Sequence, residues 1–441
     1  MVPNIAERHF PGLDMSGIYC RYPHHHHTAS SLGLAEAMPI RGISGMSQHR
    51  GSGPAPSRTV RILGTHGVPA DYGGFETAAE NVGLYLANAG WRVIVYCQVT
   101  GHGPIIEDTW RGLERVKIPV DADGWRGTSI FDLRAVAHAV RFDDPCLLFG
   151  YNTAVFNLIQ RLKGTPLVIN MDGMEWSRSR WGRFRQSILW ANEQIGRVIG
   201  NDLIADHPRI EDYLRRRTRA AKITMIPYGA DAVTSAPEAP VREQGLEPGK
   251  YLTLICRPIP ENSILELVQG FSARQRGVRL AILGDYDGER IAYHHQVREA
   301  ASDEVEFLGS IYDPPTTQAL RYHALGYLHG HTVGGTNPSL VEAMGAGNPV
   351  IAHDNVYNRW VAEDSALYFS TADDVDRHIT ELLESPNLIQ KLGERAQRRH
   401  GDLFTWQRVG AQYDRLLSRH LPEDPNTSAT VHNSAPIGGL A

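Results

Sequence analysis

The sequence predicts an α/β protein made of two Rossmann-like domains in series, each with a parallel sheet covered on both faces by helices. Short apolar runs alternate with amphipathic stretches from residue 59 onward, and continuous apolar strands of this kind are typical of parallel sheets. A segment rich in proline, glycine and charge interrupts the alternation at 231–250, after which the alternation resumes. We therefore expect this segment to connect two α/β domains.

The composition narrows the classes of function. The chain has 441 residues, of which 42% are hydrophobic and 21% are charged, as in globular proteins. Its formal net charge of -5 argues against general nucleic-acid binding, which needs a basic surface. The four cysteines form no C-x-x-C pair, and no apolar run is long enough to cross a membrane. We therefore expect a cytoplasmic location, with membrane contact only at the surface, and no disulfide framework.

The same pattern sets the domain boundaries. Residues 1–57 lack a period and are expected to be a disordered lead-in, as is the tail at 421–441. The first domain is expected at 58–230, the second at 231–402, and a helix at 403–420 is expected to return to the first domain. Strands are expected at 60–65, 91–98, 115–120, 146–151, 166–172, 203–206 and 222–229, and then at 251–257, 279–285, 305–310, 325–330, 349–354 and 367–371.

A glycine-rich loop follows the first strand, in GTHGVPADYGGFE at 64–76. Glycine permits close backbone approach, and the helix that follows offers free N–H groups to an anion. The spacing is not G-x-G-x-x-G, and the second strand ends without an acidic residue, which disfavours ordinary NAD binding. Gly73 and Gly74 could serve only a tight turn. His66, Tyr72 and Glu76 make the loop chemically rich, and we favour a ligand role.

A second motif, HGHTVGGTNPSLVEAM, occupies 329–344. Asn337 is expected to cap a helix that begins at Pro338, and the N–H groups of that helix could face a diphosphate. Glu342 lies about one turn into the helix, where its carboxylate could accept hydrogen bonds from two vicinal hydroxyls, as on a ribose. The alternative is a solvated helix face, but the surrounding residues are apolar.

A third motif, LICRPIPENS at 254–263, places Arg257 at the end of an apolar strand. A guanidinium there can bind and neutralise a diphosphate, although a structural ion pair, for instance with Glu261, is the alternative. The nearby LGDYDG ends another strand at the same edge, and Gly284 could let backbone approach a nucleobase or form only a turn.

A fourth motif, NMDGMEWSRSRWGRFRQ at 170–186, combines acidic and basic groups. Asp172 and Glu175 end a strand, where a carboxylate facing the cleft could orient a sugar hydroxyl. The basic and aromatic residues that follow form either a solvated helix face or a patch for an anionic lipid or lipid diphosphate. The patch would contain Arg178, Arg180, Trp181, Arg183 and Arg185.

Taken together, these motifs resemble the GT-B glycosyltransferases of the family 4 type, through the glycine pair, the arginine after the first strand of the second domain, and the pattern E-A-M-x-x-G-x-P-V-I-A from Glu342. The stretches GTHGVPADYGGFET, DGMEWSRSRWG, IPYGAD and HGHTVGGTNPSLVEAM resemble a subgroup containing bacterial rhamnosyltransferases of capsule and exopolysaccharide synthesis. The resemblance covers roughly residues 58–418. It implies the GT-B fold, with two Rossmann-like domains facing across a cleft and a C-terminal helix that packs back on the first domain.

The resemblance also implies transfer of a sugar from a nucleotide diphosphate donor with retention of anomeric configuration. Glu342 would hold the ribose, Arg257 the diphosphate, and the Gly73–Gly74 loop would approach the donor phosphates from across the cleft. Three positions depart from the family pattern: Gly334 replaces the first of its paired glutamates, Asn262 a lysine, and Met171–Asp172 a histidine. The residues expected to rebuild the contacts with the donor sugar are His331, Thr336 and Asn337, and Gly334 and Gly335 are expected among the donor-binding residues.

The expected reaction uses the nucleotide sugar as co-substrate, a glycan or lipid-linked acceptor, and no cofactor or obligatory metal. No D-x-D of the metal-binding kind stands at a strand end, because DAD at 121–123 is expected to be a turn. Front-face retention would let a diphosphate oxygen take the acceptor proton. The alternatives are an NAD-dependent oxidoreductase, a GT-B epimerase of nucleotide sugars and a non-catalytic nucleotide-sugar sensor.

Overall fold

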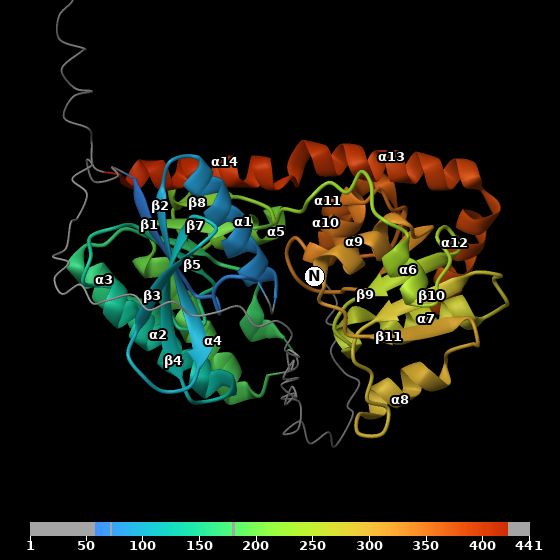
Figure 1. The fold of residues 1–441 in the computed structure, drawn as a ribbon, viewed down its shortest axis with the longest axis horizontal. Helices are drawn as coiled ribbons and strands as arrows, with labels where there is room; N and C mark the ends of the chain where they lie inside the picture. The colour runs from blue at the N-terminus through green and yellow to red at the C-terminus, as the bar shows by residue number, and fades with distance from the viewer. Residues whose placement is uncertain (1–57, 71–72, 179–180, 422–441) are drawn as a thin grey trace, which may run out of the picture.

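The computed structural model describes residues 58–70, 73–178 and 181–421, and it confirms the predicted α/β fold class. Two domains, each built on one sheet, lie side by side, and α13 and α14 run along one side of both (Figure 1). The predictions for residues 1–57, for nearly all of the tail and for Tyr72 and Arg180 lie outside the described residues.

The first domain contains an eight-stranded sheet in the order β3-β4-β2-β1-β5-β6-β7-β8. All seven predicted strands are present, and they pair in parallel. β3, which the sequence did not predict, pairs antiparallel with β4 at the edge. The strands are β1 (Thr59–Leu63), β2 (Arg92–Thr100), β3 (Ile106–Trp110), β4 (Leu113–Val120), β5 (Cys146–Phe149), β6 (Leu167–Asn170), β7 (Asp202–Ala205) and β8 (Ile223–Met225).

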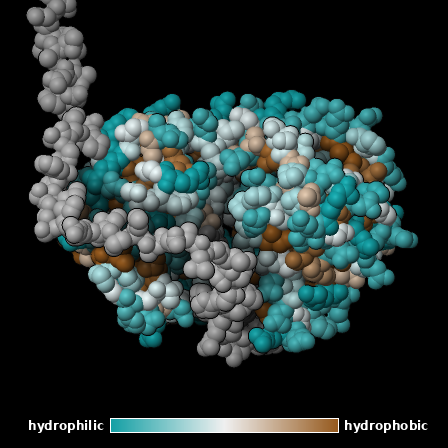
Figure 2. Space-filling model, viewed as in Figure 1, coloured by the Kyte–Doolittle hydropathy of each residue, from teal (hydrophilic) through white to brown (hydrophobic). Residues whose placement is uncertain are grey.

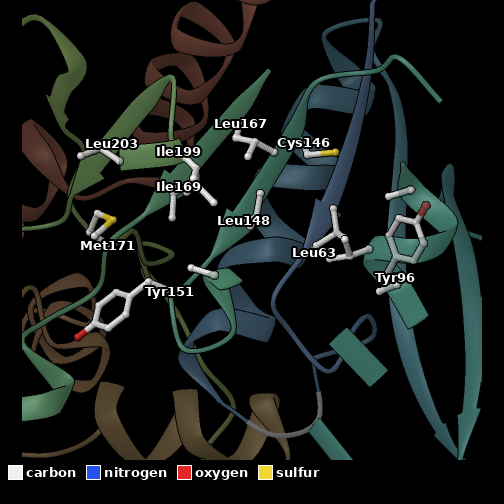
Figure 3. Close-up of a cluster of buried hydrophobic side chains, with 14 of the residues drawn as sticks. Leu63, Tyr96, Cys146, Leu148, Tyr151, Leu167, Ile169, Met171, Ile199 and Leu203 are labelled. Atoms are coloured by element: carbon white, nitrogen blue, oxygen red, sulfur yellow. The ribbon is translucent and has the colours of Figure 1, made fainter. Parts of the chain in front are cut away.

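Helices cover both faces of this sheet, which explains the continuous apolar runs of its strands. α2, α4 and α5 pack on one face, where Leu148, Ile169 and Leu203 of neighbouring strands point into a shared core (Figure 3). α1 packs on the other face together with α14. The helices of this domain are α1 (Gly74–Asn88), α2 (Gly124–Ala139), α3 (Leu158–Lys163), α4 (Arg183–Ile199) and α5 (Pro208–Arg215). The segment DAD, expected as a turn, leads into α2, whose N-cap is Asp123.

The second domain contains a six-stranded parallel sheet in the order β11-β10-β9-β12-β13-β14, and all six strands were predicted. They are β9 (Tyr251–Ile255), β10 (Arg279–Leu283), β11 (Val305–Gly309), β12 (Gly326–His329), β13 (Val350–His353) and β14 (Ala366–Phe369). The helices are α6 (Ala239–Glu243), α7 (Ile264–Ser272), α8 (Ala292–Glu299), α9 (Pro314–Tyr322), α10 (Pro338–Gly345), α11 (Val356–Ala362), α12 (Ala372–Glu384) and α13 (Pro386–Leu403).

The last helix, α14 (Trp406–Leu417), ties the end of the chain to the first domain. Asp414 accepts a hydrogen bond from the indole of Trp91 at 2.8 Å, and the hydroxyl of Tyr413 accepts one from the Asn170 amide at 3.2 Å. Gly410 lies so close to α1 that a Cβ there would meet the ring of Tyr85 at 2.3 Å. The chain therefore crosses between the domains twice, before β9 and again between α13 and α14.

Candidate active site between the two sheets

The glycine loop after β1 reaches the second domain. Gly73 is the N-cap of α1, and an added Cβ on Gly74 would lie 3.2 Å from Cγ of Pro338 and 3.8 Å from the ring of Tyr228. The loop is closed by Glu76, a buried residue whose Oε1 accepts a hydrogen bond from the N–H of His66 at 2.9 Å. The structure thus brings together two of the predicted motifs, although they come from different domains.

The start of α10 has the predicted cap. Asn337 precedes the helix, its Oδ1 accepts the N–H of Ser339 at 3.1 Å, and Pro338 is the first helical residue. This arrangement leaves N–H groups of the first turn for a ligand or for water. The predicted capping role of Asn337 is confirmed, and α10 points its N-terminal turn at the glycine loop.

Glu342 has a partner that the sequence did not reveal. Its Oε2 lies 2.5 Å from Nη2 of Arg321, a buried residue of α9, while about a third of the Glu342 side chain (32%) stays exposed. The position is therefore neither a simple solvated face nor an unpaired carboxylate. Arg321 lies in none of the predicted motifs; its signal in the sequence is only an arginine within an amphipathic helix, PPTTQALRY.

The ion pair makes Glu342 important for stability as well. Replacing Glu342 with alanine leaves Arg321 charged and buried, so we expect the free energy of unfolding to fall by about 3 kcal/mol. This value is at the lower end of the range for broken buried ion pairs, because Glu342 is partly exposed. Glu342→Gln keeps an oxygen that can accept from the guanidinium, and should lose less. Denaturant unfolding measures both changes.

A matched control is the exposed pair between Arg92 and Glu114, with N–O contact at 2.7 Å. Glu114→Ala should cost less than about 1 kcal/mol, because such exposed pairs contribute little. An equal loss of stability in Glu114→Ala and Glu342→Ala would contradict a structural role for the Arg321–Glu342 pair.

Asp206, the residue directly after β7, forms a second contact between the domains, and it was not among the predicted site residues. Its Oδ2 accepts the N–H of Thr336 at 3.0 Å, and its main-chain carbonyl accepts the Thr336 hydroxyl. A Cβ on Gly335 would lie 2.1 Å from Oδ1 of Asp206. Burial, reinforced by the charge of Asp172, raises the pKa of Asp206 to about 7.

Asp172 and Glu175 differ in their surroundings, although both follow β6 as predicted. Asp172 is half-buried and holds a left-handed backbone with φ +50, a conformation that non-glycine residues seldom adopt outside functional sites and turns. Glu175 is buried. Its Oε1 accepts from the indole of Trp181 at 2.9 Å, and its Oε2 lies 2.6 Å from Nε of Arg178. Glu175 thus holds its own loop together.

Arg178 links this loop to the second domain. Its Nη1 lies 3.6 Å from Oε2 of Glu261, in the loop that follows Arg257. Arg257 itself is exposed, and among the described residues it makes no ion pair, so the alternative of a pair with Glu261 is not observed. The side chain of Arg178 lies in this interdomain network instead of on an open surface, and only 22% of it is exposed.

The loops around Arg257 are shaped by other predicted residues. Asn262 is buried and its amide donates to the carbonyl of Arg257 at 2.7 Å. Gly284 has φ +143, and a Cβ there would lie 3.1 Å from the carbonyl oxygen of Cys256. Both positions therefore support the backbone that carries Arg257.

His331 lies close to Arg257 and Arg178. Its ring stacks on that of His329 with centroids 4.5 Å apart. Burial, together with the charges of Arg257 and Arg178, lowers the pKa of His331 to about 3, so that the imidazole is neutral. Gly334 has φ +135, and its Cα lies 3.9 Å from a Cβ built on Gly173, which brings the predicted donor loop against the first domain.

The remaining members of the predicted basic patch lie at the start of α4. Arg183 is exposed, and the guanidinium of Arg185 lies 5.5 Å from the centre of the Trp181 ring.

In the part of the chain that the structure describes, no group of three histidine, cysteine or acidic side chains could hold a metal ion. No helix within the described ranges is both long and apolar enough to span a bilayer.

Two family profiles match separate parts of the chain. Residues 57–231 match a family described as "Domain of unknown function (DUF1972)", and residues 265–415 match one described as "Glycosyl transferase-like". No curated protein sequence matches the chain.

Solved structures resemble nearly the whole described chain. Sucrose-phosphate synthase from Thermosynechococcus elongatus superposes with a TM-score of 0.69 at 20% identity, covering 82% of this chain and 98% of that one. HepE from Anabaena, in complex with UDP and glucose, gives 0.65 at 18% identity and covers 82% and 100%. A glycosyltransferase from Rickettsia africae gives 0.63 at 12% identity and covers 83% and 99%. The chain therefore has the GT-B fold.

Proposed function

We propose that this protein is a glycosyltransferase that moves a sugar from a nucleotide diphosphate donor to an acceptor hydroxyl in the cleft between the two sheets. One observation carries the proposal: Gly74 of the first domain lies against Pro338, where the first turn of α10 begins. In open α/β sheets, ligands bind beyond the carboxyl ends of the strands, and a helix N-terminus there suits a diphosphate. The glycosyltransferase-like profile over 265–415 supports the same reaction class.

The chemical task is to stabilise negative charge on the leaving diphosphate. In the proposed reaction the bond from the anomeric carbon to the phosphate oxygen breaks, a bond from that carbon to the acceptor oxygen forms, and the acceptor proton passes to a phosphate oxygen. Arg257 and the N–H groups at the start of α10 supply fixed positive potential for this step. Because these groups belong to the protein, we propose that no metal is obligatory.

The other predicted residues take supporting roles. We propose that the exposed part of Glu342 binds the ribose while Arg321 orients it. Neutral His331 and the backbone of Gly334 line the sugar site, and Asn262 and Gly284 shape the Arg257 loop. Thr336 acts as a positioning residue, because its hydroxyl is engaged by Asp206.

On the acceptor side, Asp172 is the proposed carboxylate for orienting hydroxyls, since Glu175 is engaged by Trp181 and Arg178. We propose retention of configuration, a rhamnosyl or related hexosyl donor, and a lipid-linked cell-surface glycan as acceptor. Arg183 and Arg185 at the start of α4 would then face its anionic linkage.

A panel of UDP-, dTDP- and GDP-sugars tests the proposal through the melting temperature. A donor that binds only the folded state adds about 2.7 kcal/mol of stability at a hundredfold excess over its Kd, so one nucleotide class should raise the Tm by several degrees. Product analysis with the stabilising donor, with and without a polyprenyl-linked glycan, should show transfer only with acceptor present. A panel without any shift, or epimerised donor formed without acceptor, would overturn the assignment.

A further inference from the structure

One face of the first domain exposes apolar side chains at helical spacing on three helices. α2 exposes Ile130 and Leu133, α3 exposes Leu158 and Leu162, and α4 exposes Phe184 and Ile188. Leu162 is 87% and Phe184 is 79% exposed, which is unusual for such large side chains when they repeat along one face. Figure 2 shows hydrophobic surface on the first domain where α2 and α3 lie in Figure 1.

The three helices form one surface because the segment before α3 joins its neighbours. The hydroxyl of Thr153 donates to Asp132 of α2 at 2.8 Å, and the N–H of Val155 donates to the amide oxygen of Asn192 in α4 at 3.0 Å. α2 and α4 pack on the same face of the sheet, opposite α1 and α14. Gln160 of α3 donates a hydrogen bond to Sγ of Cys146 in that same core at 3.1 Å. We name this surface the α2–α3–α4 face.

The charged side chains that the three helices themselves expose are of one sign. Residues 124–139, 154–163 and 183–199 contain six arginines and one lysine. They contain two acidic residues, Asp132 and Glu193, and both are buried. The chain as a whole carries a formal charge of -5, so the positive charge is a local property of these helices. Lys163 at the end of α3 pairs with Asp143 outside them.

Apolar residues with basic residues beside them match the boundary between headgroups and acyl chains of an anionic bilayer. Trp125 and Trp190 are half exposed on α2 and α4, and tryptophan favours the headgroup level. A second copy of the chain fits poorly, because a two-fold contact places the same surface against itself and would bring cations against cations.

We propose that the α2–α3–α4 face docks the protein on an anionic phospholipid bilayer. The proposal deepens the proposed function by placing the acceptor side at a membrane, but it uses no residue of the donor site. Its binding test therefore gives a result whether or not the glycosyltransferase assignment holds.

The test is flotation of the full chain with vesicles of equimolar phosphatidylglycerol and phosphatidylcholine, compared with vesicles of phosphatidylcholine alone. We expect binding to the anionic vesicles and its loss at high salt. The double variant Leu162→Ser/Phe184→Ser should bind at least about tenfold more weakly, because two apolar insertions are lost. Its melting temperature should not fall, since both side chains are exposed.

A matched control is Ile106→Ser, because Ile106 is 55% exposed on β3 of the same domain but outside the face. It should bind vesicles like the unaltered chain. Equal binding by the double variant, or no binding of the unaltered chain to anionic vesicles, would overturn the proposal. So would a dimer in solution that the double variant converts to a monomer, because the occupant would then be a second copy. A normal donor-induced Tm shift in the double variant separates this outcome from failure of the donor site.

Discussion

Arg257→Ala is expected to lower kcat/KM for sugar transfer by about 10²–10³-fold or more, the usual cost of removing one preorganised group that stabilises developing negative charge. The fold should survive, because Arg257 is exposed and makes no ion pair among the described residues. Kinetics with the donor identified by thermal shift, together with thermal unfolding of the free protein, measure both parts of the prediction.

Two further variants sharpen this result. Arg257→Lys keeps the charge but not the planar fork of the guanidinium, so it should recover part of the lost activity. Arg290→Ala removes an arginine of the same domain that is 86% exposed in its side chain, and it should leave kcat/KM unchanged. Full activity in Arg257→Ala would end the assignment of the diphosphate site.

The strands could be predicted because burial on both faces imposes continuous apolar runs, as in TVRIL of β1 and CLLF of β5. β3 was not predicted, because it is not buried on both faces and therefore has no continuous apolar run. Its sequence IEDTW is mostly polar and exposed, as expected of an edge strand, and its pairing with β4 is antiparallel. The local sequence pattern therefore predicted the strands that form the core of each sheet but not β3, a strand at the edge of the first sheet.

The site was predictable where the backbone itself carries the chemistry. The glycine pair and the Asn337–Pro338 cap are local signals, and the structure places them in contact. Arg321 and Asp206 were not predictable, because each acts through a residue far away in the sequence. Asp206 binds a residue 130 positions later, and in the sequence it is only one polar residue after an apolar strand.

The contact between Asp206 and the donor loop leads to the second large effect. A methyl group at position 335 would lie 2.1 and 2.2 Å from the two carboxylate oxygens of Asp206, well inside contact distance, so Gly335→Ala must displace either the loop or the carboxylate. Forced overpacking of this kind costs about 1–3 kcal/mol. We expect the closed arrangement of the two domains to be destabilised by the same amount of free energy. We expect kcat/KM to fall about 10–100-fold, measured alongside the Tm of the free protein.

Gly182→Ala is the matched control, because a Cβ at Gly182, the N-cap of α4, would meet no atom of the described residues within 4 Å. Adding Asp206→Ala to Gly335→Ala removes the group that the methyl would strike. If the clash is the cause, the double variant should lose less activity than the two single variants combined, since residues in contact are not additive. Strict additivity would show that the clash with Asp206 is not the cause of the loss. Wild-type activity in Gly335→Ala would show that catalysis does not depend on this closure. A non-additive result would instead tie Asp206, which touches no proposed substrate group, to the reaction through the loop that it holds.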